Sequence, residues 1–273
     1  MSVVADLESL AAQVPDGAMV AFPRDPCGAP MAFAKALVRR GARKLHYVGV
    51  PSFGMAGDML IGAGCVATIE AAGGTLGEYG TAPRFAAALR AGTIALKDAT
   101  CPAIHAALQA GQKGIPFIPL RGLIGSDLVK HRPDWKTIDN PFAAGKDPIV
   151  LLPALRPDVA VIHVALADRH GNAWIGRERE LLTMAHAARR TLVTAEEIVD
   201  RDLLADETMA AGTLPALYVA GVARAERGAA PLGFLDRYAE DGAALADYAR
   251  RARTADGFAA WLDENVLARR AAA

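Results

Sequence analysis

The sequence predicts an open α/β fold with a largely parallel sheet and flanking helices. Apolar, strand-like runs alternate with helix-like segments over most of the 273 residues, an order typical of strands joined by helices. Two runs, 149–154 and 159–168, are almost wholly apolar, as expected for strands buried on both faces of a parallel sheet. The chain is long enough to bury a full core, and we expect one domain over 1–273 with its core at about 15–230.

Strand and helix alternate clearly in the first half of the chain. Residues 3–14 have helical spacing and precede a Pro-Asp-Gly turn. Pro30 suits the first position of a helix, and Gly41 suits its end, because Gly adopts the conformation that closes helices. Further strands are predicted at 18–22, 44–50, 65–71, 93–99 and 115–120, and further helices at 58–62, 82–92 and 102–111.

The second half of the chain is less regular. Residues 121–147 hold Gly, Pro, Asp and His with little periodicity, which predicts a long functional or interface loop. Glu196 and Glu197 are expected to begin a helix, since carboxylates are favoured at helix N-termini. Strands are also predicted at 191–196 and 216–222, a helix near 177–189, and an Ala- and Arg-rich helical tail at about 234–270.

The bulk composition is that of an ordinary globular protein, with 52% apolar and 22% charged residues. Lys+Arg and Asp+Glu number 30 each, so no basic excess favours nucleic acid or an anionic membrane. No apolar run is long enough for a membrane span and no signal-peptide pattern is seen, which predicts no membrane association.

The cysteines predict reduced thiols and a cytoplasmic location. Cys27, Cys65 and Cys101 are widely spaced and show no metal-binding spacing, so no metal site is expected. Cys65 lies in an apolar run typical of the core, whereas Cys27 follows a proline in a loop that we expect to be open to solvent.

The most informative stretch is rich in glycine and contains a single carboxylate. Residues 73–80 read GGTLGEYG and follow a predicted strand, the position at which open α/β sheets bind ligands. The pattern is neither a dinucleotide fingerprint nor a P-loop. Glu78 is therefore a candidate nucleophile, general base or substrate-orienting group. The alternative is a structural turn whose carboxylate caps the helix that starts near Pro83.

Arginines supply the candidate anion contacts. Arg24 lies in the loop after a strand, and its guanidinium suits a carboxylate or a phosphate, although a surface pair with Asp25 is equally expected. Arg84 and Arg121 are similar candidates, with a structural or surface role as the alternative. His163 lies inside an apolar strand and is predicted to be a satisfied core histidine. Ser126, Asp127 and His131 lack the elbow of a serine hydrolase.

Taken in order, several segments resemble the A (alpha) subunit of the family I CoA-transferases, nearest to the glutaconate CoA-transferase type. They are 16–22, 57–64, 77–85, 115–128 and 192–200. The resemblance implies an open α/β fold of the CoA-transferase type, a B (beta) subunit as partner, and an αβ-based assembly such as α2β2. It also implies a coenzyme A thioester and a carboxylic acid as substrates, no tightly bound cofactor, and a glutamyl-CoA intermediate on a glutamate of the B subunit.

The same resemblance assigns the site residues and leaves alternatives open. The loop Phe22–Pro26 departs from the Gly-Gly-Phe-type turn of the family. Heterodimeric relatives hydrolyse a ring carbon–carbon bond in CoA-linked steroid fragments with an A-subunit glutamate as base, a role that Glu78 fits. A non-enzymatic acyl-CoA-binding subunit is the third reading, and a large apolar partner face is expected in each case. The residues expected to shape the acyl site are Glu78, Arg24, Gly77, Tyr79, Gly80 and Arg121.

Overall fold

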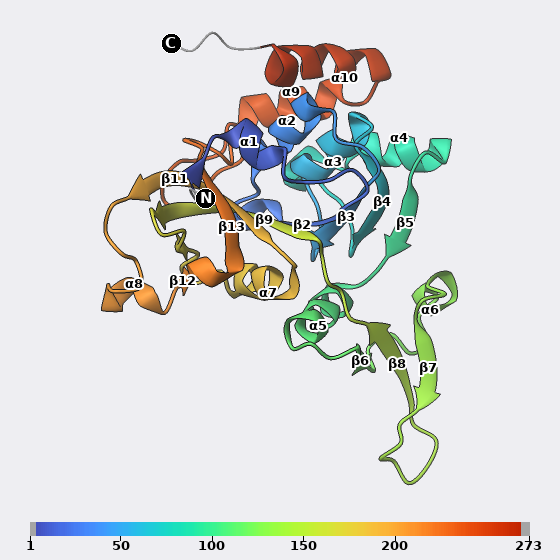
Figure 1. Ribbon diagram of the computed structural model, residues 1–273. Helices are drawn as coiled ribbons and strands as arrows, with labels where there is room; N and C mark the ends of the chain where they lie inside the picture. The colour runs from blue at the N-terminus through green and yellow to red at the C-terminus, as the bar shows by residue number, and fades with distance from the viewer. Residues whose placement is uncertain (1–3, 269–273) are drawn as a thin grey trace.

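A mostly parallel sheet forms the centre of the molecule in the computed structural model, which describes residues 4–268 (Figure 1). Its strands are β1 (Val4–Ala5), β2 (Met19–Pro23), β3 (Leu45–Val50), β4 (Val66–Ala71), β5 (Ala95–Asp98), β9 (Val159–Asp168), β10 (Ala173–Trp174), β11 (Thr191–Val199), β12 (Thr213–Leu214) and β13 (Val219–Arg224). The order along the main path is β1-β13-β11-β9-β2-β3-β4-β5. Every neighbouring pair on this path is parallel, whereas β10 pairs antiparallel with β9 and β12. The predicted fold class is confirmed.

Helices cover both faces of this sheet, and alternate residues of each strand reach the two cores. Val20 and Phe22 of β2 belong to one buried cluster and Ala21 to the other, as the two-residue period of a strand requires. The helices packed on the first cluster are α1 (Leu7–Ala11), α2 (Met31–Arg40), α3 (Met55–Gly62), α4 (Pro83–Ala91), α9 (Gly242–Arg251) and α10 (Ala255–Leu262). Those on the second are α5 (Cys101–Gln112) and α7 (Arg179–Ala187).

The molecule also contains several short helical elements. They are the 3-10 turns η1 (Asp25–Cys27), η2 (Gly77–Tyr79) and η3 (Ala216–Tyr218), the helix α8 (Glu207–Ala210), and the π-helical turn η4 (Asp263–Leu267). Within residues 4–268 there is no helix with both the length and the apolar character needed to cross a bilayer.

An arm built from residues 117–153 extends away from the main sheet (Figure 1). It contains β6 (Phe117–Leu120), α6 (Leu128–His131), β7 (Lys136–Asp139) and β8 (Pro148–Pro153). The strands pair antiparallel in the order β6-β8-β7. Two predictions were therefore wrong: 121–147 is not all loop, and the run 149–154 does not join the parallel sheet. Both apolar runs look alike in sequence, and only their pairing partners distinguish them.

The N-terminal segment also differs from the prediction of one helix over 3–14. Asp6 accepts a hydrogen bond from the Ser9 N–H at 2.9 Å, and this cap starts α1 at Leu7. The two residues before the cap, Val4 and Ala5, extend the sheet beside β13. A good capping residue thus divides a short apolar segment into strand and helix.

Glu196 and Glu197 lie in β11 rather than at the start of a helix. Glu197 pairs in register with Leu166 of β9, and Glu196 lies 2.8 Å from the buried His163 Nε2. His163 Nδ1 lies 3.0 Å from Thr194 Oγ1, so the prediction of a satisfied core histidine is confirmed. The buried imidazole gives Glu196 a partner inside the sheet, which outweighs the preference of carboxylates for helix ends.

Candidate functional site

A cavity of about 530 Å³ lies at the carboxyl ends of β2, β3 and β4. Strand order reverses between β2 and β9, and open α/β sheets bind ligands beside such a reversal. The loops after the three strands form one side, and residues between 232 and 248 form the other. Its lining residues are Arg24, Asp25, Pro26, Ser52, Phe53, Gly54, Met55, Thr75, Leu76, Gly77, Glu78, Tyr79, Leu232, Glu240, Leu245 and Tyr248.

The Gly-rich turn places Glu78 on the cavity wall. Gly77 and Gly80 have φ angles of 63° and 104°, which other residues adopt only with strain. The Leu76 N–H donates to the Gly80 carbonyl at 2.8 Å and closes the turn. Glu78 does not cap the following helix, because the N-cap of α4 is Ala82 and has no side-chain cap hydrogen bond. The exposed Glu78 carboxylate is therefore available to a ligand.

Tyr79 connects this turn to the C-terminal side of the cavity. Its hydroxyl donates to Glu240 Oε1 at 3.0 Å. That hydrogen bond, with a further contribution from burial, raises the pKa of Tyr79 to about 12. Tyr79 is therefore a neutral hydrogen-bond donor at physiological pH.

Arg24 stands at the rim of the cavity and is held by α7 rather than by Asp25. Its Nε lies 3.2 Å from Glu180 Oε1, and its side chain is 46% exposed. The two terminal guanidinium nitrogens have no hydrogen-bond partner within residues 4–268. The predicted surface pair with Asp25 is therefore wrong, and the free part of the guanidinium can contact an anion.

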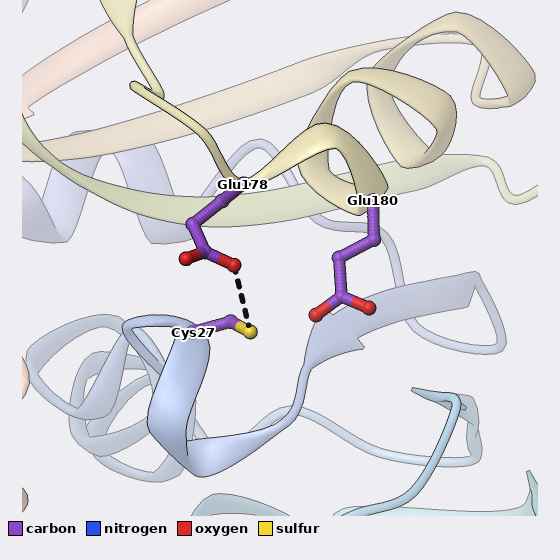
Figure 2. Close-up of side chains that lie close together, drawn as sticks. All are labelled: Cys27, Glu178 and Glu180. Carbon is purple, nitrogen blue, oxygen red and sulfur yellow. Dashed lines mark hydrogen bonds between the residues drawn. The ribbon is translucent and has the colours of Figure 1, made fainter.

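The loop that carries Arg24 is also fastened to α7 through Cys27. Figure 2 shows Glu178 and Glu180 reaching from the start of α7 toward the Cys27 sulfur, which donates to Glu178 Oε2 at 3.2 Å. Cys27 is only 3% exposed, so the prediction of an open position was wrong. Burial makes the largest contribution to raising the pKa of the Cys27 thiol, and the two nearby carboxylates raise it further. The thiol therefore keeps its proton.

These three side chains are also a group that has the spacing of metal ligands. The Cys27 sulfur and one oxygen each of Glu178 and Glu180 lie within 4.8 Å of one another. The Cys27 thiol already donates a hydrogen bond to Glu178, and the Arg24 guanidinium forms an ion pair with Glu180. Each carboxylate therefore has a partner within the protein. Neither glutamate was singled out from the sequence, because nothing local indicates a contact with a loop some 150 residues earlier.

Two buried carboxyl groups support the cavity wall. Asp25 Oδ2 accepts the Met55 N–H at 3.1 Å, and burial raises the pKa of Asp25 to about 6. Asp58 accepts the Phe85 N–H at 2.8 Å and the Tyr248 hydroxyl at 2.7 Å, and burial also raises its pKa to about 6. The sequence analysis missed Asp58, although a lone carboxylate in the apolar helical run 55–62 is a signal for a buried polar contact.

The structure brings together most of the residues predicted for the site. Arg24, Gly77, Glu78 and Tyr79 line the same cavity, and Gly80 ends the turn that carries three of them. Arg121 lies on the arm, where it forms a bidentate ion pair with Asp147 and does not line the cavity. Arg84 donates to the Ala252 carbonyl at 3.2 Å and stacks on the Phe258 ring, a structural role.

The fold and the cavity define an α/β protein with an open, largely parallel sheet and a cavity at the switch point of its strands. Residues 4–225 match the family model described as Coenzyme A transferase, and the chain belongs to this family. The A subunit of the 3-oxoadipate CoA-transferase of Pseudomonas knackmussii is 33% identical over 244 residues, which cover 87% of this chain and 83% of the relative.

Two further similarities bear on the reaction. The IpdA subunit of the cholesterol ring-cleaving hydrolase of Rhodococcus jostii is 30% identical, with 82% of this chain and 78% of the relative covered. The structure of glutaconate coenzyme A-transferase from Acidaminococcus fermentans superposes with a TM-score of 0.89 at 26% identity, covering 97% of this chain and 89% of that one. The family resemblance predicted from the sequence is confirmed.

Proposed function

We propose that the chain is the A subunit of a heteromeric CoA-transferase that moves CoA from an acyl-CoA to a carboxylic acid. The observation that carries the proposal is the convergence of Arg24, Glu78 and Tyr79 on one cavity at the switch point of the sheet. A volume of about 530 Å³ suits a small ligand such as an acyl group. The relatives named as A subunits support a B subunit as partner.

The proposed reaction uses a glutamate of the B subunit as nucleophile. Its carboxylate attacks the thioester carbonyl, which forms an acyl–glutamyl anhydride and releases CoA as a thiolate. The thiolate then attacks the glutamyl carbonyl of the anhydride, which gives glutamyl-CoA and frees the first carboxylic acid. The acceptor carboxylate collects CoA by the same two steps in reverse.

This chain would position the acyl group during these steps. Arg24 would bind a carboxylate at the far end of the acyl chain, since its terminal nitrogens have no hydrogen-bond partner among the described residues. The Glu78 N–H would stabilise the oxyanion that forms at the thioester carbonyl, because the N–H groups of its neighbours in the turn already donate within the protein. Glu78 would form part of the pocket wall.

We further propose an α2β2 assembly in the cytoplasm, with the arm as one of its contact surfaces. Exposed apolar side chains occur on the arm, among them Phe117, Ile138 and Phe142, which is 96% exposed. Apolar side chains exposed together mark interaction sites. Light scattering of the copurified proteins would test this assembly, and a stable lone monomer would contradict it.

The second candidate function is a ring-opening hydrolase with Glu78 as base. It is favoured by the exposed Glu78 carboxylate on the cavity wall and by the similarity to the hydrolase subunit. Glu78 would take a proton from water, the resulting hydroxide would add to a ring carbonyl, and the adjacent carbon–carbon bond would break. The electron pair would remain on the released carbon, which then takes up a proton.

The substitution Glu78→Gln separates the two functions in the copurified complex. A transferase with its nucleophile on the partner should retain measurable CoA exchange between acyl-CoA and carboxylate. A hydrolase should lose about 10²–10⁴-fold in water-dependent turnover, the usual contribution of a general base. Glu197→Gln, at an exposed strand position outside the cavity, is the matched control. Absence of CoA exchange by the wild-type complex would refute the transferase proposal.

A further inference from the structure

The start of α7 holds the loop that carries Arg24 at two points. The Cys27 sulfur donates to Glu178 Oε2 at 3.2 Å, and Arg24 Nε lies 3.2 Å from Glu180 Oε1. Both glutamates reach toward the loop from the same end of the helix (Figure 2). Glu178 therefore fixes the loop through a buried cysteine, whereas Glu180 holds the Arg24 side chain itself.

Glu180 is the fixed partner in this ion pair because α7 is anchored in the core. Leu181 and Met184 of the helix are buried and belong to the second core cluster. The Glu180 side chain is only 16% exposed, compared with 46% for Arg24. Its second oxygen, Oε2, lies 3.9 Å from Nε2 of His105 on α5. The position of the Glu180 carboxylate is thus set by packed helices, and the more exposed arginine follows it.

The contact with Glu180 engages only one edge of the Arg24 guanidinium. The hydrogen bond comes from Nε, and the two terminal nitrogens have no partner within residues 4–268. A guanidinium held at Nε still presents its terminal N–H groups in the planar fork that matches a carboxylate. A long side chain that is already held in place also loses less rotamer freedom when a ligand binds, which favours binding.

Glu180 also keeps Arg24 from pairing with the carboxylates of the cavity. Among the described residues that line the cavity, Arg24 is the only lysine or arginine, and Glu78 and Glu240 line it as well. Either carboxylate would compete with a ligand carboxylate for the guanidinium. Arg24 is bonded to neither of them, and its partner Glu180 lies outside the cavity lining. The ion pair therefore leaves the fork open to a ligand.

We propose that Glu180 is a positioning residue that sets the direction of Arg24, and thereby the preference of the site for acyl groups that end in a carboxylate. The identity of the ligand as an acyl-CoA rests on the proposed function. Glu180 does not line the cavity, so it acts on the ligand only through Arg24. Its removal should weaken the binding of acyl groups that Arg24 contacts and leave the binding of other acyl groups unchanged.

Calorimetric titration of the copurified complex with glutaryl-CoA and butyryl-CoA tests this preference, because only the first acyl group ends in a carboxylate. We expect the wild type to bind glutaryl-CoA about tenfold more tightly than butyryl-CoA, as one partly exposed charge-assisted contact allows. Glu180→Ala should lower this ratio to about threefold or less, with the Kd for butyryl-CoA unchanged. In steady-state kinetics its KM for glutaryl-CoA should rise while kcat stays within about twofold.

Further variants separate positioning from a purely structural role. Glu180→Gln keeps an oxygen that accepts the Nε–H and should retain most of the wild-type ratio. Glu180→Asp is one methylene shorter, should lower the ratio as Glu180→Ala does, and replaces that variant if it does not fold. In the Arg24→Ala background, Glu180→Ala should have no further effect on the ratio, because the two residues act as a unit. Glu8→Ala, which removes the partner of Arg39 at an ion pair outside the cavity, is the matched control and should keep the wild-type ratio.

The outcomes distinguish this inference from the proposed function. The inference alone is overturned if the wild type shows no preference, if Glu180→Ala weakens both CoA esters equally or neither, or if its effect persists in the Arg24→Ala background. The expected ratios without CoA exchange by the wild type support the inference and refute the transferase. Failure of both CoA esters to bind the complex overturns both.

Discussion

Tyr79 donates its hydroxyl hydrogen to Glu240, with 3.0 Å between the two oxygens. The bond joins residues 161 positions apart and connects the Gly-rich turn to the segment that precedes α9. The C-terminal part of the chain, which the sequence predicts only as a helical tail, therefore contributes a wall of the cavity through Glu240, Leu245 and Tyr248.

Tyr79→Phe should weaken the contact between the Gly-rich turn and the segment before α9 without unfolding the protein. The hydrogen bond is at an exposed position, and the net value of such bonds is about 0.5–1.5 kcal/mol. We expect KM for an acyl-CoA to rise by roughly threefold to tenfold, while the urea midpoint changes little. Steady-state kinetics of the copurified complex provide the measurement. An unchanged KM would show that the bond does not shape the site.

Arg24→Ala should weaken the binding of acyl-CoAs that end in a second carboxylate. A partly exposed charge-assisted contact is lost, and we expect KM for glutaryl-CoA to rise about tenfold. Butyryl-CoA, which lacks that carboxylate, should be affected far less. A similar loss for both substrates would contradict a direct contact with the acyl terminus.

Arg121→Ala is the companion variant, since the sequence predicts the same role for Arg121. Arg121 forms its ion pair with Asp147 on the arm, outside the cavity. We therefore expect KM for glutaryl-CoA to change by less than about twofold. An increase as large as that of Arg24→Ala would show that the arm reaches the substrate in the assembled enzyme.

Tyr248→Phe should destabilise the fold and make its stability more dependent on pH. Asp58 would lose the hydroxyl donor of Tyr248, at a cost of about 1–3 kcal/mol. Because the folded pKa of Asp58 is already raised to about 6 by burial, stability falls as pH rises from about 4 to 6. The missing donor would extend this fall to higher pH. Urea unfolding from pH 4 to 8 tests the prediction, and parallel curves for wild type and variant would contradict it.

Glu196→Gln should lower the free energy of unfolding at neutral pH but not in acid. Burial alone would raise the pKa of Glu196, but hydrogen bonds from His163, Tyr238 and the Arg227 N–H lower it to about 2. The carboxylate therefore contributes stability above its ordinary pKa of 4.5, and this contribution is lost as pH falls from 4.5 toward 2. We expect a loss of about 1–3 kcal/mol at pH 7.

Urea unfolding of Glu196→Gln and of the exposed-site control Glu197→Gln measures this effect. The difference between wild type and Glu196→Gln should shrink below about pH 4. A difference that stays constant down to pH 2 would show that the loss comes from packing rather than from charge.

The sequence could assign residues next to strand ends to the candidate site, because the loops that carry them are recognised from neighbouring residues alone. Glu78 and Arg24 follow strands in Gly- or Pro-rich loops, and in a parallel sheet such loops gather at one edge. The partners that orient them were not predictable, since Glu180 and Glu240 meet them only across long stretches of chain. The prediction for the arm was wrong because its apolar strand β8 has the composition of a strand in the parallel sheet. The strands that pair with β8 could not be identified from its own residues.

The sequence by itself determined the alternation of strand and helix, the family, and the loops that carry the candidate site. These follow from local periodicity, from turn residues and from the order of recognisable segments. Only the tertiary structure decided that the Asp25 carboxyl group packs against Gly54, that Cys27 is covered by two carboxylates, and that Arg121 lies outside the cavity. Burial and the electrostatic surroundings of a charged group depend on atoms from distant parts of the chain, and no local pattern records them.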